Sequence, residues 1–288
     1  MKQLFYTKSD GEKDRTLSCT EWGNTQSPHK IFCVHGLTRN SRDFDFLAAE
    51  LVNTLNPPHV ICPDMAGRGH SDWLDNPEGY NNETYLMDCL DLIRHLGWNE
   101  MDWVGTSMGG IIGMSLAAME DSQVQRLVLN DIGPFIPKAA LMRIAAYLKS
   151  EPLIFNSLDE AEAHLRFIHA PFGNLTDGEW HHLAKYSTRT IDNPAGALMM
   201  HYDPAIGHAF TGDIEDVEFW PVWEAITADT VLLSGENSDI LLESTVRQMK
   251  STKKSFRFHE FENVGHAPAL MASDQIEVIK NALLTKSM

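Results

Sequence analysis

The chain has 288 residues, with 23 Lys and Arg against 40 Asp and Glu, and a formal net charge of −17 at pH 7. This acidity, spread along the chain, argues against nucleic acids and anionic membrane surfaces as partners. No apolar run reaches the length of a membrane span and the N-terminus lacks the apolar region of a signal peptide, so a cytoplasmic location is expected.

The first predicted elements are two short alternating segments, residues 4–7 and 16–22, separated by the turn-rich residues 9–12. They predict an antiparallel hairpin. Continuous apolar runs at 30–34 and 59–64 are typical of strands buried on both faces.

Helical spacing of apolar residues follows each of these buried strands. One helix is expected from Ser41, its predicted N-cap, to Leu55, and a second from Asn82 to Leu96, with Gly97 as its C-terminal signal. A strand at 101–104 then leads into the segment Gly105-Thr106-Ser107-Met108-Gly109 and a further helix.

The remaining elements continue this alternation after an interruption. They are the strands 125–131, 230–235 and 256–261 and the helices 242–249 and 273–284. Strands and helices that alternate at this pace predict an α/β fold with a mostly parallel, doubly wound sheet.

The interruption, residues 132–223, shows helical spacing and no convincing buried strand. It is predicted to be a helical cap, or lid, domain inserted into a core domain of residues 1–131 and 224–288. Helices are expected at 143–148 and 160–168, and a looser segment at 194–202.

The segment around Ser107 has the pattern G-x-S-x-G between a predicted strand and a predicted helix. Gly105 and Gly109 would relieve the collisions of a sharp strand-to-helix turn, which would hold the Ser107 hydroxyl clear of the backbone. The amide of Met108, in the first turn of the helix, would be free to bind an oxyanion. The alternative is a plain tight turn.

A reactive serine needs a base, and the base needs an acid that fixes its tautomer. Asp239 follows one predicted strand and His266 follows the last one, so both would lie at the same sheet edge as Ser107. Asp131 also ends a strand and is the alternative acid; Asp239 is preferred because it follows the strand after the cap.

Taken together, these segments resemble the α/β-hydrolase fold superfamily, in its cap-bearing group of serine hydrolases that includes carboxylesterases. The resemblance covers nearly the whole chain through His35-Gly36, residues 67–71, the segment around Ser107, Asp239 and Gly265-His266. It implies that Ser107 is the nucleophile, His266 the base and Asp239 the acid of a catalytic triad. It also implies an oxyanion hole formed by the amides of Leu37 and Met108.

Other polar residues have structural interpretations. Asp64 is expected to cap backbone groups or to pair with Arg68. The histidines of the cap raise the question of a metal site, but their spacing matches no helical ligand pattern, and neither a metal nor a cofactor is expected. The four cysteines lack C-x-x-C spacing and are predicted to be buried free thiols; they are Cys19, Cys33, Cys62 and Cys89.

A substrate pocket is expected beneath the cap. The residues predicted to line it are His35, Phe135, Met142, Met199, Phe210 and Trp220. Core packing within the cap is the alternative for each of the cap residues.

The resulting hypothesis is a carboxylic ester hydrolase that cleaves small to medium acyl esters through an acyl-enzyme. A carbon–carbon bond hydrolase with the same triad is the first alternative, and it would need a basic pocket residue such as Arg39, Arg143 or Arg189. A small-ligand binding protein without catalysis is the second. The expected partner is a small-molecule ester, and the chain is expected to be a monomer or a homodimer.

Overall fold

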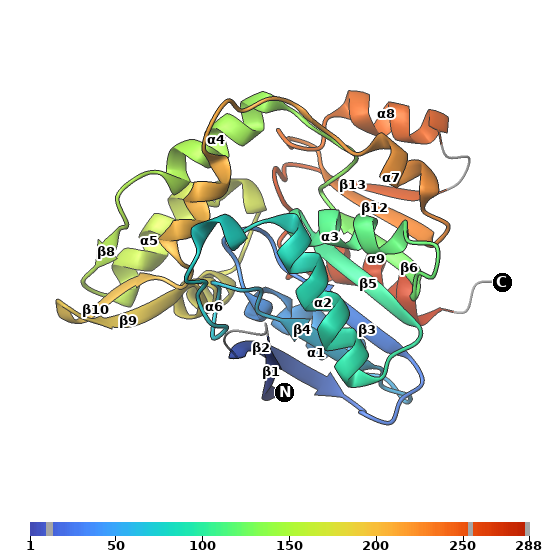
Figure 1. The fold of residues 1–288 in the computed structure, drawn as a ribbon, viewed down its shortest axis with the longest axis horizontal. Coiled ribbons are helices and arrows are strands. Elements are labelled where there is room, and N and C mark those ends of the chain that lie inside the picture. Colours follow the sequence, from blue (N-terminus) through green and yellow to red (C-terminus); the bar gives the residue numbers. More distant parts are fainter. Residues whose placement is uncertain (10–13, 253–255, 286–288) are drawn as a thin grey trace.

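The computed structural model describes residues 1–9, 14–252 and 256–285, and its centre is an eight-stranded sheet (Figure 1). The strand order is β1-β2-β4-β3-β5-β6-β12-β13. The bounds of these strands are β1 Lys2–Ser9, β2 Asp14–Gly23, β3 Lys30–Val34, β4 His59–Pro63, β5 Met101–Thr106, β6 Val124–Asn130, β12 Asp229–Gly235 and β13 Arg257–Phe261.

All strands from β4 to β13 in this order run parallel, whereas β2 is antiparallel to both β1 and β4. The predicted N-terminal hairpin is therefore confirmed, although residues 10–12 of its turn lie outside the described residues. The carboxyl ends of β3, β5, β6, β12 and β13 meet at one edge of the sheet, where ligands bind in such folds.

Helices cover both faces of the sheet, as the alternating pattern predicts. Helices α1 and α9 pack on one face, and α2, α3, α7 and α8 pack on the other. Their bounds are α1 Asp45–Val52, α2 Asn82–Leu96, α3 Met108–Ala117, α7 Trp220–Ala225, α8 Glu243–Thr252 and α9 Ser273–Leu284. Because both faces are covered, the parallel strands are apolar along most of their length.

The predicted first helix differs in detail. The 3₁₀-helix η1, Ser41–Phe44, precedes α1, and the side chain of Asn40, not Ser41, caps it by accepting from the Arg42 amide. Ser41 instead donates its own amide to Asp64. The prediction of α2 is confirmed at both ends, and Gly97 follows it with a φ of 66°.

The chain between β6 and β12 forms a layer over the carboxyl edge of the sheet (Figure 1). The two predicted cap helices are present within longer ones. The elements here are β7 Phe135–Ile136, α4 Lys138–Leu148, β8 Ile154–Phe155, α5 Leu158–Ile168, η3 Ala170–Phe172, α6 Asp177–Ser187, β9 Thr188–Asp192, β10 Ala195–Met200, η4 Pro204–Phe210 and β11 Val217–Glu218.

This layer is less purely helical than the sequence suggests. Strands β8, β10 and β9 form a small antiparallel sheet, and β10 occupies the segment that was expected to be loose. These strands are short and half-exposed, so they lack the continuous apolar run by which a buried strand is recognised. The domain division itself stays a prediction.

None of the helices in the described ranges combines the length and the apolar character needed to cross a membrane.

Candidate active site

Ser107 forms the corner between β5 and α3, with φ 52° and ψ −113°. The glycines on either side are required by close backbone contacts: a Cβ on Gly105 would lie 2.3 Å from the carbonyl oxygen of Gly109, and one on Gly109 would lie 2.0 Å from that of Val34. Trp103 stabilises the corner, since its Nε1 donates to the Gly109 carbonyl over 3.0 Å. A strained residue held this firmly is typical of a functional site.

His266 reaches this corner from the loop between β13 and α9. Its Nε2 lies 2.9 Å from Oγ of Ser107, and its Nδ1 lies 2.7 Å from Oδ2 of Asp131. The carboxylate can only accept, so the hydrogen is assigned to Nδ1 and Nε2 is left to accept from the Ser107 hydroxyl. This is the arrangement that a base-activated serine needs.

Asp131 follows β6 directly and is fully buried. Besides His266 it accepts from the amide of Gly235 over 2.9 Å and from Oγ of Ser238 over 2.6 Å. Three donors therefore compensate the burial of this charge, which also fixes its orientation toward His266.

The prediction that Asp239 contacts His266 is wrong. The Asp239 carboxylate accepts from Nε and Nη2 of Arg143, over 2.6 and 2.9 Å, and both side chains are about half exposed. The sheet order explains the difference: β6 lies directly beside β5, so the residue that ends β6 is next to Ser107. Asp131 was the alternative acid, and the structure places it in contact with His266.

Asp64 has the structural position that its sequence context suggests. Its carboxylate accepts from the amides of Ser41 and His70, over 2.8 and 3.0 Å, and so joins the loops after β3 and β4. It does not pair with Arg68, which donates to the carbonyls of Leu37 and Ala66 and to the hydroxyl of Tyr85.

His35 is a second connection between these two loops. It is fully buried, with Nδ1 2.7 Å from the carbonyl oxygen of Gly36, and Nε2 accepts from the amide of Met65 over 3.0 Å. Burial lowers the pKa of His35 to about 4, so the ring is neutral at pH 7. The prediction that it lines the substrate pocket is wrong, because it lies beneath the loop that does.

Arg68 is fully buried and contacts both residues of the predicted oxyanion hole. Its Nε donates to the carbonyl oxygen of Leu37 over 2.8 Å, and its Nη2 lies 3.7 Å from Sδ of Met108. Nη1 donates to the carbonyl of Ala66 and to the hydroxyl of Tyr85, each over 2.7 Å, and the guanidinium lies 4.7 Å from the Tyr85 ring centre. The sequence motif of residues 67–71 pointed to this loop but not to these contacts.

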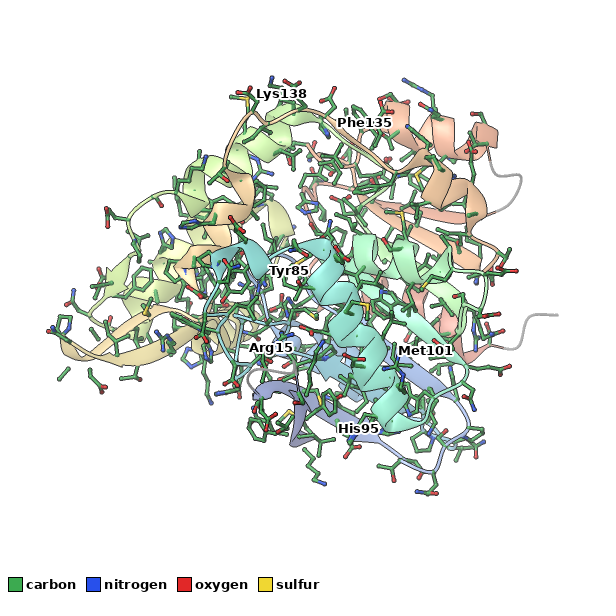
Figure 2. All side chains as sticks on the ribbon, in the orientation of Figure 1. Arg15, Tyr85, His95, Met101, Phe135 and Lys138 are labelled. Atoms are coloured by element: carbon green, nitrogen blue, oxygen red, sulfur yellow. The ribbon has the colours of Figure 1, made fainter. Side chains whose placement is uncertain are left out.

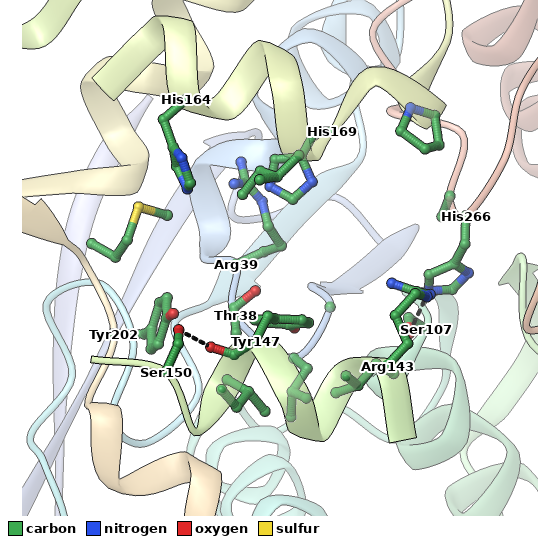
Figure 3. Close-up of a pocket in the computed structure, with 18 of the residues that line it drawn as sticks. Thr38, Arg39, Ser107, Arg143, Tyr147, Ser150, His164, His169, Tyr202 and His266 are labelled. Carbon is green, nitrogen blue, oxygen red and sulfur yellow. Dashed lines mark hydrogen bonds between the residues drawn. The ribbon is translucent and has the colours of Figure 1, made fainter. Parts of the chain in front are cut away.

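A cavity of about 590 Å³ opens at Ser107 and His266 (Figure 3). The loop of residues 36–39 lines it from the core, and α4, α5, η3 and β10 line it from the cap. The amide of Met108 belongs to the first residue of α3, which has no intrahelical acceptor. The oxyanion role of Leu37 and Met108 stays a prediction.

A model of the alpha/beta hydrolase family matches residues 31–279. The chain belongs to this family. It is 38% identical to a 3-hydroxybutyrate-oligomer hydrolase of Cupriavidus necator over 90% of this chain and 89% of the relative. It is 27% identical to the esterase Rv0045c of Mycobacterium tuberculosis over 94% and 87% of the two chains.

Among solved structures, this alpha/beta hydrolase is similar to a putative hydrolase from Rickettsia typhi, with a TM-score of 0.92, 36% identity and 100% coverage of both chains. The match confirms the predicted fold. Together with the family match it shows that the chain is a hydrolase of the alpha/beta type.

Of the cap residues predicted to line the pocket of this alpha/beta hydrolase, Met199 does so. The other predictions are wrong. Four residues are not part of the cavity lining: Phe135, Met142, Phe210 and Trp220. Phe135 is in β7, near the start of α4, and pairs with Glu218 of β11 (Figure 2), while Met142 is 54% exposed. Phe210 ends η4, and Trp220 begins α7 and packs on the core. Apolar character in the cap could not reveal which side of each element faces the site.

The residues that line the cavity instead include several polar groups that the sequence did not single out. Burial raises the pKa of Tyr147, and raises that of Tyr202 to about 12, so both phenols stay protonated. Burial lowers the pKa of His164, and that of His169 well below its usual value with the charge of Arg39 as a further cause. Both imidazoles are therefore neutral at pH 7.

The four cysteines are free and buried, as predicted. Within the described ranges, no three His, Cys, Asp or Glu side chains gather as a metal site would require.

Proposed function

We propose that this hydrolase cleaves carboxylic esters through an acyl-enzyme formed on Ser107. The observation that carries the proposal is the continuous chain of contacts from Ser107 through His266 to Asp131, at 2.9 and 2.7 Å. A serine hydroxyl is a poor nucleophile at neutral pH, and this chain supplies the base and the acid that activate it.

In the proposed reaction, Oγ of Ser107 attacks the ester carbonyl carbon while Nε2 of His266 takes the hydroxyl proton. The amides of Leu37 and Met108 bind the resulting oxyanion, and each such donor contributes about 3–4 kcal/mol in comparable hydrolases. Asp131 stabilises the imidazolium. The intermediate then collapses, the alcohol leaves with the proton from His266, and the acyl group stays on Ser107.

Water completes the cycle by the same route. His266 takes a proton from the water as its oxygen attacks the acyl carbon, a second oxyanion forms, and Ser107 leaves with that proton. The products are a carboxylic acid and the regenerated enzyme. A small-molecule ester is thus the proposed partner, with neither metal nor cofactor used.

The names of the relatives support an ester substrate, since one is an esterase and the other a 3-hydroxybutyrate-oligomer hydrolase. Oligomers of short hydroxy acids are therefore the first compounds to test beside simple esters.

The proposal is tested with p-nitrophenyl esters of short acids and with a fluorophosphonate that labels activated serines. Ser107→Ala should lower kcat on the order of 10⁶-fold and abolish labelling. Ser115→Ala is the matched control, because Ser115 lies on α3 and bonds the carbonyl of Ile111 away from the cavity. Labelling of another residue, or equal turnover by Ser107→Ala, would refute the proposal.

A carbon–carbon bond hydrolase is the second candidate, because two cations, Arg39 and Arg143, line the cavity with Ser107. Each is already paired with a carboxylate, Asp43 and Asp239 respectively, which favours an uncharged substrate and hence the ester. Arg189 stacks on Trp73. Turnover of a vinylogous diketone acid with no turnover of esters would reverse this order.

A further inference from the structure

The cavity continues well beyond the reacting serine. Figure 3 shows Ser107 and His266 at one end and His164, Ser150 and Tyr202 at the other, with Thr38, Arg39 and Tyr147 between them. We call the part lined by Arg39, Tyr147, His164, Met199 and Tyr202 the distal chamber. A volume of about 590 Å³ is in the range of sites that hold drug-sized ligands, and a short acyl group would fill only a part of it.

A buried guanidinium and two phenol groups border the distal chamber. Nε and Nη2 of Arg39 bind Asp43 at 2.8 and 2.7 Å, but its buried Nη1 has no hydrogen-bond partner among residues 1–9, 14–252 and 256–285. Arg39 is 6% exposed and this nitrogen is buried, so the residue contributes its charge to the chamber wall and not an open donor. Tyr147, which is 41% exposed and hydrogen-bonded to Thr38, and Tyr202 add two protonated phenols to the lining.

The charges around the chamber are largely neutralised. His164 and His169 are uncharged at pH 7, and the charge of Arg39 is offset by Asp43. Arg143 is similarly paired with Asp239 nearer to Ser107. Glu151 adds a carboxylate to the cavity lining, so the wall carries no excess of positive charge.

This chemistry discriminates between substrates. An alkyl chain in the chamber would exclude water and leave the phenol donors unpaired, at a cost of about 1–3 kcal/mol for each buried group. A chain that carries carbonyl oxygens would accept from them. The thioether of Met199 and the aromatic rings would cover the apolar atoms between these oxygens.

We propose that the distal chamber binds a second carbonyl-bearing unit of the substrate, so that the enzyme prefers short oligoesters of hydroxy acids to alkyl esters of the same shape. The inference rests on the proposed function of Ser107 and deepens it. Tyr147 and Tyr202 supply the donors, and the bond cleaved is the ester whose carbonyl lies at Ser107.

The test compares two p-nitrophenyl esters of matched shape. One is the ester of 3-acetoxybutanoate and the other is the ester of 3,5-dimethylhexanoate. In the second, a methylene group replaces the bridging ester oxygen and a methyl group replaces the carbonyl oxygen. After division by their rates of alkaline hydrolysis, kcat/KM should be at least about tenfold higher for the acetoxy compound. An equal or inverse preference would overturn the proposal.

Variants then locate the effect. Tyr147→Phe and Tyr202→Phe each remove one hydroxyl, and each should lower the acetoxy-to-alkyl ratio about three- to tenfold. Tyr6→Phe is the matched control, because Tyr6 lies on β1 against His95, outside the cavity lining. A ratio unchanged in both cavity variants, or lowered equally by Tyr6→Phe, would overturn the proposal.

A third ester distinguishes a carbonyl from a carboxylate. If the mono-p-nitrophenyl ester of 3-methylglutarate, which carries a free carboxylate, is the best of the three, the chamber is an anion site and the proposal is wrong. Failure of the proposed function has a separate signature, since no ester would then be cleaved and Ser107 would not react with the fluorophosphonate. Turnover of p-nitrophenyl acetate without the acetoxy preference refutes the distal chamber alone.

Discussion

Oδ2 of Asp131 lies 2.7 Å from Nδ1 of His266, across 135 positions of sequence. The contact exists because β6 is hydrogen-bonded to both β5 and β12, so its last residue faces the turn that carries Ser107 and the loops that follow β12 and β13. The carboxylate that comes later in the chain, Asp239, is held by Arg143.

Exchange of the two carboxylates for amides separates their roles. Asp131→Asn should lower kcat on the order of 10³- to 10⁴-fold, because the amide would favour the wrong tautomer of His266. Asp239→Asn should change kcat less than about tenfold, since it weakens only a half-exposed ion pair. Steady-state kinetics on one p-nitrophenyl ester measures both, and the opposite order of effects would restore Asp239 as the acid.

The close backbone contacts at the corner between β5 and α3 lead to a prediction about stability. Gly109→Ala would place a Cβ 2.0 Å from the carbonyl oxygen of Val34, so either β3 or α3 must move. We expect a loss of more than about 2 kcal/mol in the free energy of unfolding together with loss of activity. Gly178→Ala in α6 is the control, because its nearest atom would be 4.0 Å away and alanine favours the helix. If urea unfolding finds the two variants equally stable, the close contact with Val34 does not require glycine at position 109.

The core elements could be predicted because the pattern of apolar residues in each one shows which of its faces are covered. Strands β3, β4 and β12 each have a continuous apolar run at their centre, as strands covered on both faces should. Helix α2 has both its apolar stripe and the glycine that ends it. Ser107 and His266 followed from the same reasoning, since each comes directly after a strand or in the loop before a helix.

Chain order alone does not show which carboxylate contacts His266 or which cap residues line the cavity. Asp131 and Asp239 both follow strands, and only the sheet order shows which strand end lies next to β5. In the cap, Met142 and Met199 are equally apolar, but one faces solvent and the other the cavity. The direction of each depends on tertiary packing of short elements with little periodicity.

Stability should depend on pH through His35. Its folded pKa, about 4, is below the ordinary value of 6.5, so between these values the unfolded chain binds more protons than the native protein. The stabilising contribution is complete above pH 6.5 and is lost as the pH falls toward 4, on the order of 2 kcal/mol or more. His201, whose burial also lowers its pKa to about 4, adds a loss of the same sign.

Urea unfolding at several pH values between 7 and 4 measures this dependence. His35→Gln should reduce the slope and leave the part due to His201 and His169, because a neutral amide takes up no proton, although the variant will be less stable at pH 7. His95→Gln, which removes an exposed imidazole from α2, is the control variant. An equal slope in the wild type and His35→Gln would show that the buried imidazole is not responsible.

Arg68 gives the last prediction, since it bonds the carbonyl of Leu37 and touches Met108 from a fully buried position. Arg68→Met would leave buried acceptors unpaired and free Leu37 and Met108, the residues proposed to bind the oxyanion, to move. We expect a loss of about 3 kcal/mol in stability and, in the folded fraction, a kcat lowered at least tenfold with a smaller change in KM.

Two variants keep this prediction decisive if Arg68→Met folds poorly. Arg68→Lys retains the charge and one donor group, so it should recover part of the kcat, whereas a purely structural role would restore stability without restoring kcat. Arg94→Met removes an exposed arginine paired with Asp91 and should alter neither quantity. A folded Arg68→Met with wild-type kcat would mean that the amides of Leu37 and Met108 keep their positions without the guanidinium.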